Sequence, residues 1–305
     1  MSKKETIVFV NGEFVPKSEA KVSVFDQGFI FGDGVFDTLI SSNGYVFKLD
    51  QHIDRLFRSA KAVGIKPQRT KENLRELVLE TVRRNGLREA YIKIIFTRGV
   101  GPKPIMGKGD VANPTLVIFA VPPVSAVPED RVAKGARLLS TTIKRTHPDS
   151  LDPRIKSLNY QPNMLMRREA IEGGADEAVC YGFDGYVAEG GAENLWVVRE
   201  RVLMTPHHGV LEGITRETIF EIARELGVSA ISTNIGRYDL YQSDEIFLCS
   251  TAGGIIPVIE VDHRMIGDGR PGPITERVRR RYAEMLREGR HGTPVFKGLK
   301  GNPGK

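Results

Sequence analysis

The sequence predicts an α+β protein of two domains. Its 305 residues are enough for two domains at roughly 100–200 residues each. The first half combines two hairpin patterns with two consecutive amphipathic helices, which is typical of an α+β fold rather than of strict strand–helix alternation. We expect a small N-terminal α+β domain over 1–122, a proline-rich linker over 123–132 and a larger domain over 133–288. The basic Gly- and Pro-rich tail, residues 289–305, is expected to be disordered.

Two Asn-Gly pairs mark the hairpins of the N-terminal domain, because this dipeptide adopts the positive φ angles of a tight turn. The first pair separates strands predicted at Ile7–Val10 and Phe14–Val15. The second separates strands predicted at Val35–Ile40 and Tyr45–Leu49. Each pattern therefore predicts an antiparallel pair.

Apolar residues then recur at helical spacing. One helix is predicted around 53–63, ending at Gly64, and a second from Thr70, a suitable N-cap, to Gly86. Two strands are predicted to close this domain, at Ala90–Thr97 and Thr115–Val121.

The larger domain is predicted to mix strands with three helices. The strands are expected at Arg137–Lys144, Glu177–Tyr181, Leu195–Val198, Glu245–Leu248 and Ile255–Val261, and the helices at Asn159–Glu172, Thr215–Leu226 and Ile274–Arg287.

Composition and charge exclude several classes of protein. The longest apolar run, Leu116–Val121, is far shorter than the roughly 20 residues of a membrane span, and the start of the chain is too polar for a signal peptide. The net charge of +6 falls to 6 − 4 = +2 without the tail, which argues against nucleic acid as a partner. Two cysteines fit a reducing cytoplasm.

The histidines and glycines suggest no familiar binding motif. The six histidines lack metal-site spacing, so no metal is expected, and His207-His208 is interpreted as part of a loop before Gly209. The glycines of residues 28–34 do not have the intervals of a dinucleotide-binding turn.

Lys156 is the first candidate for chemistry. It lies in an extended stretch just before a predicted helix, with Pro162 in the first turn, where proline is tolerated. The positive end of a helix and burial both disfavour an ammonium, as a lysine that forms Schiff bases requires. The alternative is one surface lysine among many.

Two further segments could bind a charged ligand. Glu189 ends a predicted strand before a double glycine, and Asn194 begins the next strand; the alternative is an exposed carboxylate beside a turn. Gly213, Ile214 and Thr215 open an amphipathic helix whose free N–H groups suit an anion; the alternative is simple capping by Thr215.

A loop and a helix add possible phosphate contacts. Ser250 and Thr251 follow a predicted strand and could hold phosphate oxygens, although a plain hairpin turn explains them as well. Arg55 lies between core-facing Ile53 and Leu56, so its guanidinium could bind phosphate or lie on a solvated helix face. Together with Lys156 and Glu189, these parts match what pyridoxal phosphate requires.

The order of the segments KSLNY, EGGAEN, GITR and STAGG resembles that of the fold-type IV, or class IV, pyridoxal-phosphate-dependent aminotransferases, and in particular of branched-chain aminotransferase-like members. The resemblance covers about residues 7–287. It implies the two-domain fold of that type, with a larger C-terminal domain of mixed, β-barrel-like sheet and helices. It also implies pyridoxal 5′-phosphate as cofactor and a homodimer.

The resemblance also implies roles on the cofactor side. Lys156 matches the Schiff-base lysine and Glu189 the partner of the ring nitrogen, and these two are the expected catalytic residues. The remaining expected cofactor contacts are Arg55, Gly213, Ile214, Thr215, Ser250 and Thr251 at the phosphate, Leu211 against the ring, and Tyr160 near the ring hydroxyl.

The substrate side departs from the family's patterns. Phe31, Asp37 and Thr38 replace residues usual in branched-chain members, and Lys93 replaces an arginine with a point charge that lacks the planar fork. Lys103 and Ile105 stand where D-amino-acid aminotransferases have an arginine and a histidine. The expected substrate contacts are Phe31, Phe36, Thr38, Tyr91, Lys93, Ala252 and Gly253.

The expected activity is transfer of an amino group from an amino acid, with branched-chain L-amino acids favoured, to a 2-oxo acid through a Schiff base on Lys156. D-amino-acid or (R)-amine transamination on the same scaffold is the main alternative, followed by an aminodeoxychorismate lyase. A catalytically silent cofactor-binding protein is the alternative from another class. The expected partners are small molecules and a second copy of the chain, with neither nucleic acid nor membrane.

Overall fold

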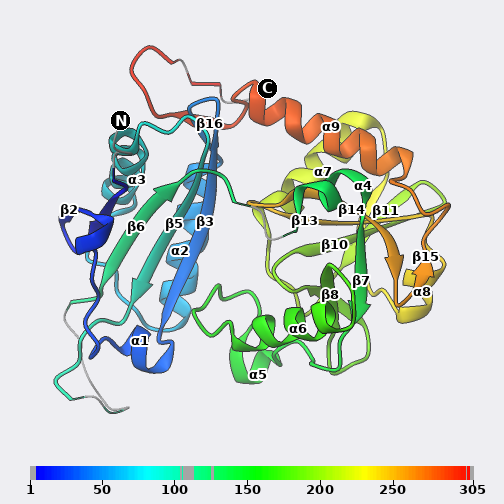
Figure 1. Ribbon diagram of the computed structural model, residues 1–305, viewed down its shortest axis with the longest axis horizontal. Coiled ribbons are helices and arrows are strands. Elements are labelled where there is room, and N and C mark those ends of the chain that lie inside the picture. The colour runs from blue at the N-terminus through cyan, green and yellow to red at the C-terminus, as the bar shows by residue number, and fades with distance from the viewer. Residues whose placement is uncertain (1–4, 104, 106–112, 125–126, 300, 303–305) are drawn as a thin grey trace. The chain divides into compact units, whose positions relative to one another are not determined.

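The computed structural model describes residues 5–103, 105, 113–124, 127–299 and 301–302. The chain divides into two compact units (Figure 1). The first is built from the described residues of Met1–Val124, Ile155–Asn159 and Met285–Lys305, and the second from those of Ser125–Arg154 and Tyr160–Glu284.

The first unit is built on a seven-stranded antiparallel sheet with the strand order β16-β4-β3-β5-β6-β1-β2. The two predicted hairpins are present, and Asn11 and Asn43 take positive φ angles at their turns. The strands are β1 (Ile7–Val10), β2 (Glu13–Pro16), β3 (Gly34–Ser42), β4 (Tyr45–Phe47), β5 (Ala90–Thr97), β6 (Leu116–Val121) and β16 (Gly292–Pro294).

Helices α2 (Leu49–Ala62) and α3 (Lys71–Asn85) pack on this sheet (Figure 1). The hydroxyl of Thr70 accepts a hydrogen bond from the Asn73 N–H at 3.1 Å, so the predicted N-cap of α3 is confirmed. A short helix, α1 (Gln27–Phe31), and a 3₁₀ turn at Lys17–Glu19 complete the unit.

The tail differs from the expected disorder. Strand β16 pairs antiparallel with β4, and the Val295 side chain is buried in the core of the first unit. The Val295 carbonyl also accepts a hydrogen bond from Arg83. The Gly- and Pro-rich composition of the tail gives no sign of this strand. Strand β16 forms because the open edge of β4 supplies hydrogen-bond partners for the backbone of the tail. Residues 125–126 of the expected linker and 300 and 303–305 of the tail lie outside the described residues.

The second unit is built on a nine-stranded mixed sheet with the order β12-β11-β10-β13-β14-β7-β8-β9, to which β15 adds beside β14. Strand β9 also contacts β10 and β11, so the sheet curls on itself. The strands are β7 (Ala136–Ser140), β8 (Glu177–Tyr181), β9 (Val187–Gly190), β10 (Asn194–Arg199), β11 (Val202–Pro206), β12 (Ala230–Thr233), β13 (Glu245–Ser250), β14 (Gly254–Val261) and β15 (Arg264–Met265).

Helices surround this second sheet, and α6 packs on β8 (Figure 1). They are α4 (Glu129–Lys134), α5 (Pro148–Leu151), α6 (Gln161–Glu172), α7 (Ile214–Leu226), α8 (Arg237–Tyr241) and α9 (Pro273–Arg287), the last of which ends in the first unit. The start of α4 falls in the expected linker. Among the described residues, no helix combines the length and apolarity that crossing a membrane requires.

Candidate active site

Lys156 lies in the first unit, within a segment tied to strand β3. Its carbonyl accepts a hydrogen bond from Phe36 N–H at 2.9 Å, and its own N–H donates to the Ser59 hydroxyl at 3.1 Å. Lys156 is 8% exposed, and its Nζ lies 4.8 Å from the centre of the Phe36 ring. Lys156 is therefore held by its backbone on both sides and is not a surface lysine.

Four expected substrate residues share one face of the same sheet. Thr38 on β3 is paired with Lys93 on β5, and Phe36 and Tyr91 lie two residues away on the same sides of their strands. Lys93 Nζ lies 4.1 Å from the centre of the Phe36 ring and donates to the Tyr91 hydroxyl at 3.2 Å. Phe31 lies apart from this face, as the last residue of α1, with 37% of its surface exposed.

Asp37 is on the opposite face of β3, buried against α2. It accepts hydrogen bonds from Arg55 Nε at 2.9 Å and Arg55 Nη2 at 2.8 Å, and its Oδ1 lies 2.8 Å from His52 Nδ1. Burial alone would raise the pKa of Asp37, but Arg55 and His52 hold it well below its usual value. Sequence analysis placed Asp37 on the substrate side and did not foresee this cluster.

The pKa of the His52 imidazole is lowered in this cluster. Burial lowers the pKa of its imidazole more than Asp37 raises it, and the positive charges of Arg55 and Lys156 lower it further. A neutral ring that donates from Nδ1 to Asp37 leaves Nε2 as an acceptor, and this buried atom has no hydrogen-bond partner among the described residues. Arg55, expected at a phosphate, is buried with two of its nitrogens on Asp37.

Glu189 lies in the second unit at the end of β9 and is 4% exposed. Arg145 Nη2 lies 2.8 Å from its Oε1, and the Leu211 N–H donates to its Oε2 at 2.9 Å. Asn194 Nδ2 bridges Glu189 Oε2 at 3.3 Å and the Leu211 carbonyl at 3.0 Å. The carboxylate is thus buried and oriented, which excludes the exposed alternative.

The start of α7 leaves its N–H groups without a side-chain cap. Gly213 is the N-cap residue, so the alternative of capping by Thr215 is wrong. A Cβ at Gly213 would lie 2.0 Å from Asn194 Oδ1, so only glycine allows this approach. Thr215 is buried beside Tyr282, whose hydroxyl has its pKa raised by burial to about 12.

The turn after β13 lies near this helix start. Strands β13 and β14 pair from Cys249–Ile255 to Ser250–Gly254, and the Ser250 hydroxyl accepts from Gly253 N–H at 3.0 Å. A Cβ at Gly254 would lie 3.9 Å from the Tyr282 ring, which also neighbours Thr215. Thr251, Ala252 and Gly253 form the partly exposed tip of the turn.

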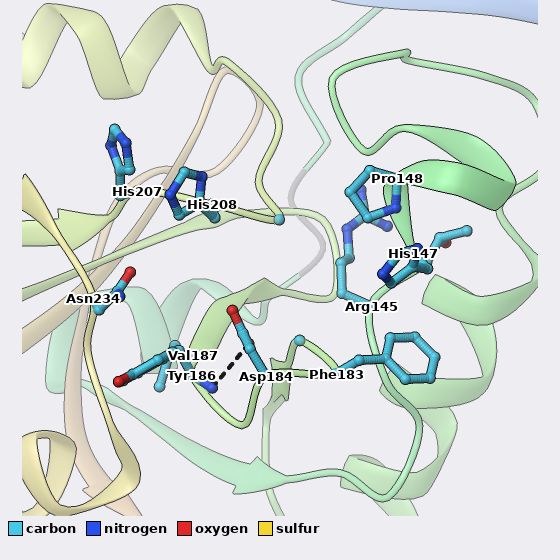
Figure 2. Close-up of a pocket in the computed structure, with 13 residues that line it drawn as sticks. Arg145, His147, Pro148, Phe183, Asp184, Tyr186, Val187, His207, His208 and Asn234 are labelled. Atoms are coloured by element: carbon cyan, nitrogen blue, oxygen red, sulfur yellow. Dashed lines mark hydrogen bonds between the residues drawn. The ribbon is translucent and has the colours of Figure 1, made fainter.

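A cavity of about 250 Å³ lies in the second unit beside Arg145 (Figure 2). His147 lines it on one side and His207 and His208 on the other, with Tyr186 below them in the view. His207 and His208 follow β11 in a loop, as expected, and their rings lie 4.1 Å apart. Arg145 lines this cavity and also binds Glu189, so the cavity lies next to the expected cofactor residues of the second unit. Burial lowers the pKa of the Arg145 guanidinium, but nearby groups raise it on balance. Glu189 is the largest of these, and Tyr160, the N-cap residue of α6, is another.

These residues fit pyridoxal phosphate in the chemistry of their groups. Lys156 offers a buried amine, Glu189 a buried and oriented carboxylate, and the uncapped start of α7 a set of N–H donors for an anion. Lys156 and Arg55 belong to the first unit, whereas Glu189, Tyr160 and the loops at Gly213 and Ser250 belong to the second. The expected cofactor residues therefore fall into two groups, one in each unit, and the residues are described within their own unit.

Comparison with known proteins identifies the family. A model of class IV aminotransferases matches residues 34–261. The chain belongs to the class IV aminotransferases. A relative from Methanocaldococcus jannaschii, whose name assigns it provisionally as a branched-chain-amino-acid aminotransferase, is 39% identical over 280 residues, which are 91% of this chain and 96% of that protein.

Two further relatives of this class IV aminotransferase differ in what their names describe. The D-alanine aminotransferase of Bacillus licheniformis is 33% identical over 276 residues, 89% of this chain and 94% of that one. The branched-chain amino acid aminotransferase of Thermobaculum terrenum, solved in its PLP-bound holo form, has a TM-score of 0.86 and 30% identity over 96% of this chain and 99% of that chain. The expected fold-type IV architecture is confirmed.

Sequence analysis missed several polar residues around the expected site. Arg145, Asn163, Glu177 and Glu193 surround Glu189 or the turn after it. A signal existed for Glu193, since it lies four residues after Glu189 in the EGGAEN motif. No local pattern marks Glu177 or Arg145, because they come from elements distant in sequence.

Proposed function

We propose that this class IV aminotransferase uses pyridoxal 5′-phosphate to move the amino group of a branched-chain L-amino acid to a 2-oxo acid, with Lys156 as the reactive lysine. The observation that carries the proposal is the burial of Lys156 at the position predicted from the KSLNY motif. The match to the family and the names of the relatives support the reaction and the substrate class.

The cofactor, when bound, supplies an electrophilic carbon for amine exchange and a ring that withdraws electrons from the substrate α-carbon. Lys156 Nζ would take the proton from the substrate α-carbon as general base and deliver it to the electrophilic carbon of the cofactor as general acid. Glu189, oriented by Arg145 and Leu211, holds the proton at the ring nitrogen. The phosphate is assigned to the α7 N-terminus, the Thr251 turn and Arg55.

Replacement of Lys156 tests the core of the proposal. Lys156→Ala removes the amine that both attaches the cofactor and transfers the proton, so we expect turnover to fall by about 10³-fold or more. The visible absorbance of the lysine-linked cofactor should also disappear in a spectrum of the purified protein. Lys66→Ala, at an exposed lysine of the first unit, is the control and should keep both. Undiminished turnover in Lys156→Ala would refute the assignment.

Lys93 is proposed to bind the substrate carboxylate from the face it shares with Tyr91, Phe36 and Thr38. Loss of a charge-assisted contact costs about 1.5–3 kcal/mol, so Lys93→Ala should raise the KM for L-leucine roughly 10-fold or more. Lys93→Arg should restore much of the affinity for L-leucine, because arginine keeps the positive charge and adds a planar fork of donors. An unchanged KM in Lys93→Ala would remove Lys93 from the site.

The D-alanine aminotransferase among the relatives is compatible with the main alternative, a D-amino-acid or (R)-amine transaminase. Initial rates with L-leucine, D-alanine and (R)-1-phenylethylamine on holoenzyme decide between L- and D- or (R)-specific transamination. Release of pyruvate without an amino acceptor would instead identify a lyase. A bound chromophore that does not respond to any amino donor would identify a silent cofactor-binding protein.

We also place the enzyme in the cytoplasm as a homodimer. The family resemblance supports the dimer, and two buried, unbridged cysteines are compatible with a reducing compartment. Sedimentation equilibrium of the holoenzyme tests the assembly, and a mass of one chain, 33.9 kDa, would contradict it.

A further inference from the structure

Two buried carboxyl groups lie against the turn that follows Glu189. Glu177 on β8 is 0% exposed and Glu193, the residue before β10, is 4% exposed. A Cβ at Gly191 would lie 2.6 Å from Glu177 Oε1, and a Cβ at Gly190 would lie 3.4 Å from Glu193 Oε2. Gly191 therefore leaves the space that the Glu177 carboxyl group occupies, and the Glu193 carboxyl group lies against Gly190.

Hydrogen bonds fasten this turn at successive residues. Glu193 Oε2 accepts from the Ala192 N–H at 2.9 Å, and the Glu193 carbonyl accepts from the Gly190 N–H at 2.7 Å. Asn163 Nδ2, on α6, donates to the Gly191 carbonyl at 2.6 Å. Displacement of the Glu193 side chain would consequently move the turn.

The turn is connected to Glu189 by two routes. Along the chain, Gly190 directly follows Glu189 in β9. Through space, Arg145 Nη2 lies 2.8 Å from Glu189 Oε1, while Arg145 Nη1 donates to Asn163 Oδ1 at 3.4 Å. Asn163 thus contacts both the turn and the arginine that orients Glu189, so the position of the turn affects the carboxylate.

The charges that face Glu193 do not balance if both carboxyl groups are ionised. Arg167 on α6 is the positive group, with Nε 3.5 Å from Glu177 Oε2. The acidic neighbours of Glu193 are Glu177 and Glu189, and the Cys249 thiol on β13 also lies near. Burial raises the pKa of Cys249, which keeps this thiol neutral.

Glu193 itself favours its protonated form. Burial, followed by the charge of Glu177, raises the pKa of Glu193 to about 8, although the Ala192 N–H and Arg167 oppose the shift. Burial also raises the pKa of Glu177. One guanidinium thus faces two buried acids, which is the arrangement in which a pair retains a proton.

We propose that Glu177 and Glu193 share one proton at neutral pH and act as a positioning pair, which holds the turn at Gly190–Gly191 and thereby orients Glu189; this inference rests on the role proposed above for Glu189. Loss of the shared proton places two negative charges against one side of the turn and displaces it. Both residues act through Glu189.

The test compares Glu193→Gln, Glu193→Ala and wild type, with Glu172→Gln and Glu172→Ala at an exposed glutamate of α6 as controls. The dissociation constant for pyridoxal phosphate and the absorbance maximum of the saturated protein are measured from pH 6 to 9.5. The amide of glutamine has the shape of a protonated carboxyl, so Glu193→Gln should bind within about threefold of wild type at pH 6.5. Glu193→Ala should bind at least 10-fold more weakly and shift the absorbance maximum.

The ratio of the wild-type to the Glu193→Gln dissociation constant should rise as the pH passes through 8, because only wild type loses the shared proton. Melting of the apoprotein supplies a second readout. Glu193 keeps a proton in the folded chain above its ordinary pKa of 4.5, so its contribution to wild-type stability falls between about pH 4.5 and 8. Glu193→Gln should lack that decline.

Wild-type affinity and spectrum in Glu193→Ala, or a constant ratio across pH 8, would overturn the inference. If Glu193→Ala does not fold, the ratio with Glu193→Gln still decides. Glu189→Gln separates this inference from the proposed function. If Glu189→Gln transaminates normally, the role of Glu189 is wrong; if it is disabled while Glu193→Ala is unaffected, only the positioning pair is wrong.

Discussion

Asp37 illustrates how the face of a strand decides what one side chain does. Phe36 and Thr38 lie on the face that carries Lys93, whereas Asp37 between them turns to α2 and is buried with Arg55 and His52. A buried carboxylate requires such partners, because desolvation without them costs several kcal/mol. Asp37, one of the three residues in which the FGDGVFDT segment departs from the branched-chain pattern, therefore makes structural contacts in the core.

Asp37→Asn should destabilise the protein by about 3–5 kcal/mol at pH 7, since it leaves the buried Arg55 without its counter-charge. The pKa of Asp37 is lowered on folding, so its contribution is present above its ordinary value of 3.8 and is lost as the pH falls toward the folded value. The difference from wild type in urea denaturation should consequently shrink below about pH 4.

Asp54→Asn is the matched control for Asp37→Asn. Asp54 is paired with Lys71 at 2.6 Å, but both side chains are about half exposed, so the pair contributes about 0–1 kcal/mol. Equal effects of the two substitutions would show that the buried cluster is not what stabilises the first unit.

At the scale of elements, the start of α7 connects the place proposed for the phosphate with the orientation of Glu189. Its 13 residues align their peptide dipoles toward Gly213, where no side chain caps the helix. Gly213 also touches Asn194, which donates to Glu189. The phosphate and ring-nitrogen assignments are thus connected through one glycine.

Gly213→Ala should weaken pyridoxal phosphate binding at least 10-fold, because its Cβ would lie 2.0 Å from Asn194 Oδ1 and displace that side chain. Titration of the apoprotein followed by visible absorbance measures this. Gly236→Ala, at the N-cap of α8, provides the control: its φ is −85° and the nearest atom to its Cβ is 3.3 Å away, so binding should not change. A similar loss in both variants would argue against a specific role for Gly213.

For the whole molecule, residues 292–295 complete the first unit. Strand β16 extends the sheet beyond β4, and Val295 enters the core that contains β3 and β5. A segment that composition describes as a tail therefore belongs to the folded unit that carries Lys156.

Ending the chain after Glu288 should lower the free energy of unfolding by about 2–4 kcal/mol, since the buried Val295 side chain alone contributes roughly 1.5–3 kcal/mol. Urea denaturation of the apoprotein measures the change. Lys297→Ala, at an exposed residue that follows Val295, retains β16 and should leave stability unaltered. Wild-type stability in the truncated chain would mean that β16 is dispensable.

The elements that sequence analysis predicted best are those with local causes. Asn11 and Asn43 mark tight turns, and Thr70 and Gly86 bound α3 because they cap it within one turn of the helix. Strands β11 and β12 were not predicted: both are short, and β12 pairs with β11 only after the intervening helix α7. The curl of the second sheet has the same non-local origin.

Sequence alone determined the family and the candidates Lys156 and Glu189, because motif order and local turns are properties of consecutive residues. Tertiary structure decided that Arg55 binds Asp37, that Arg145 binds Glu189, and that β16 joins the first sheet. These outcomes depend on which groups share a buried space, and the energy of a buried charge is set by neighbours that lie far away along the chain.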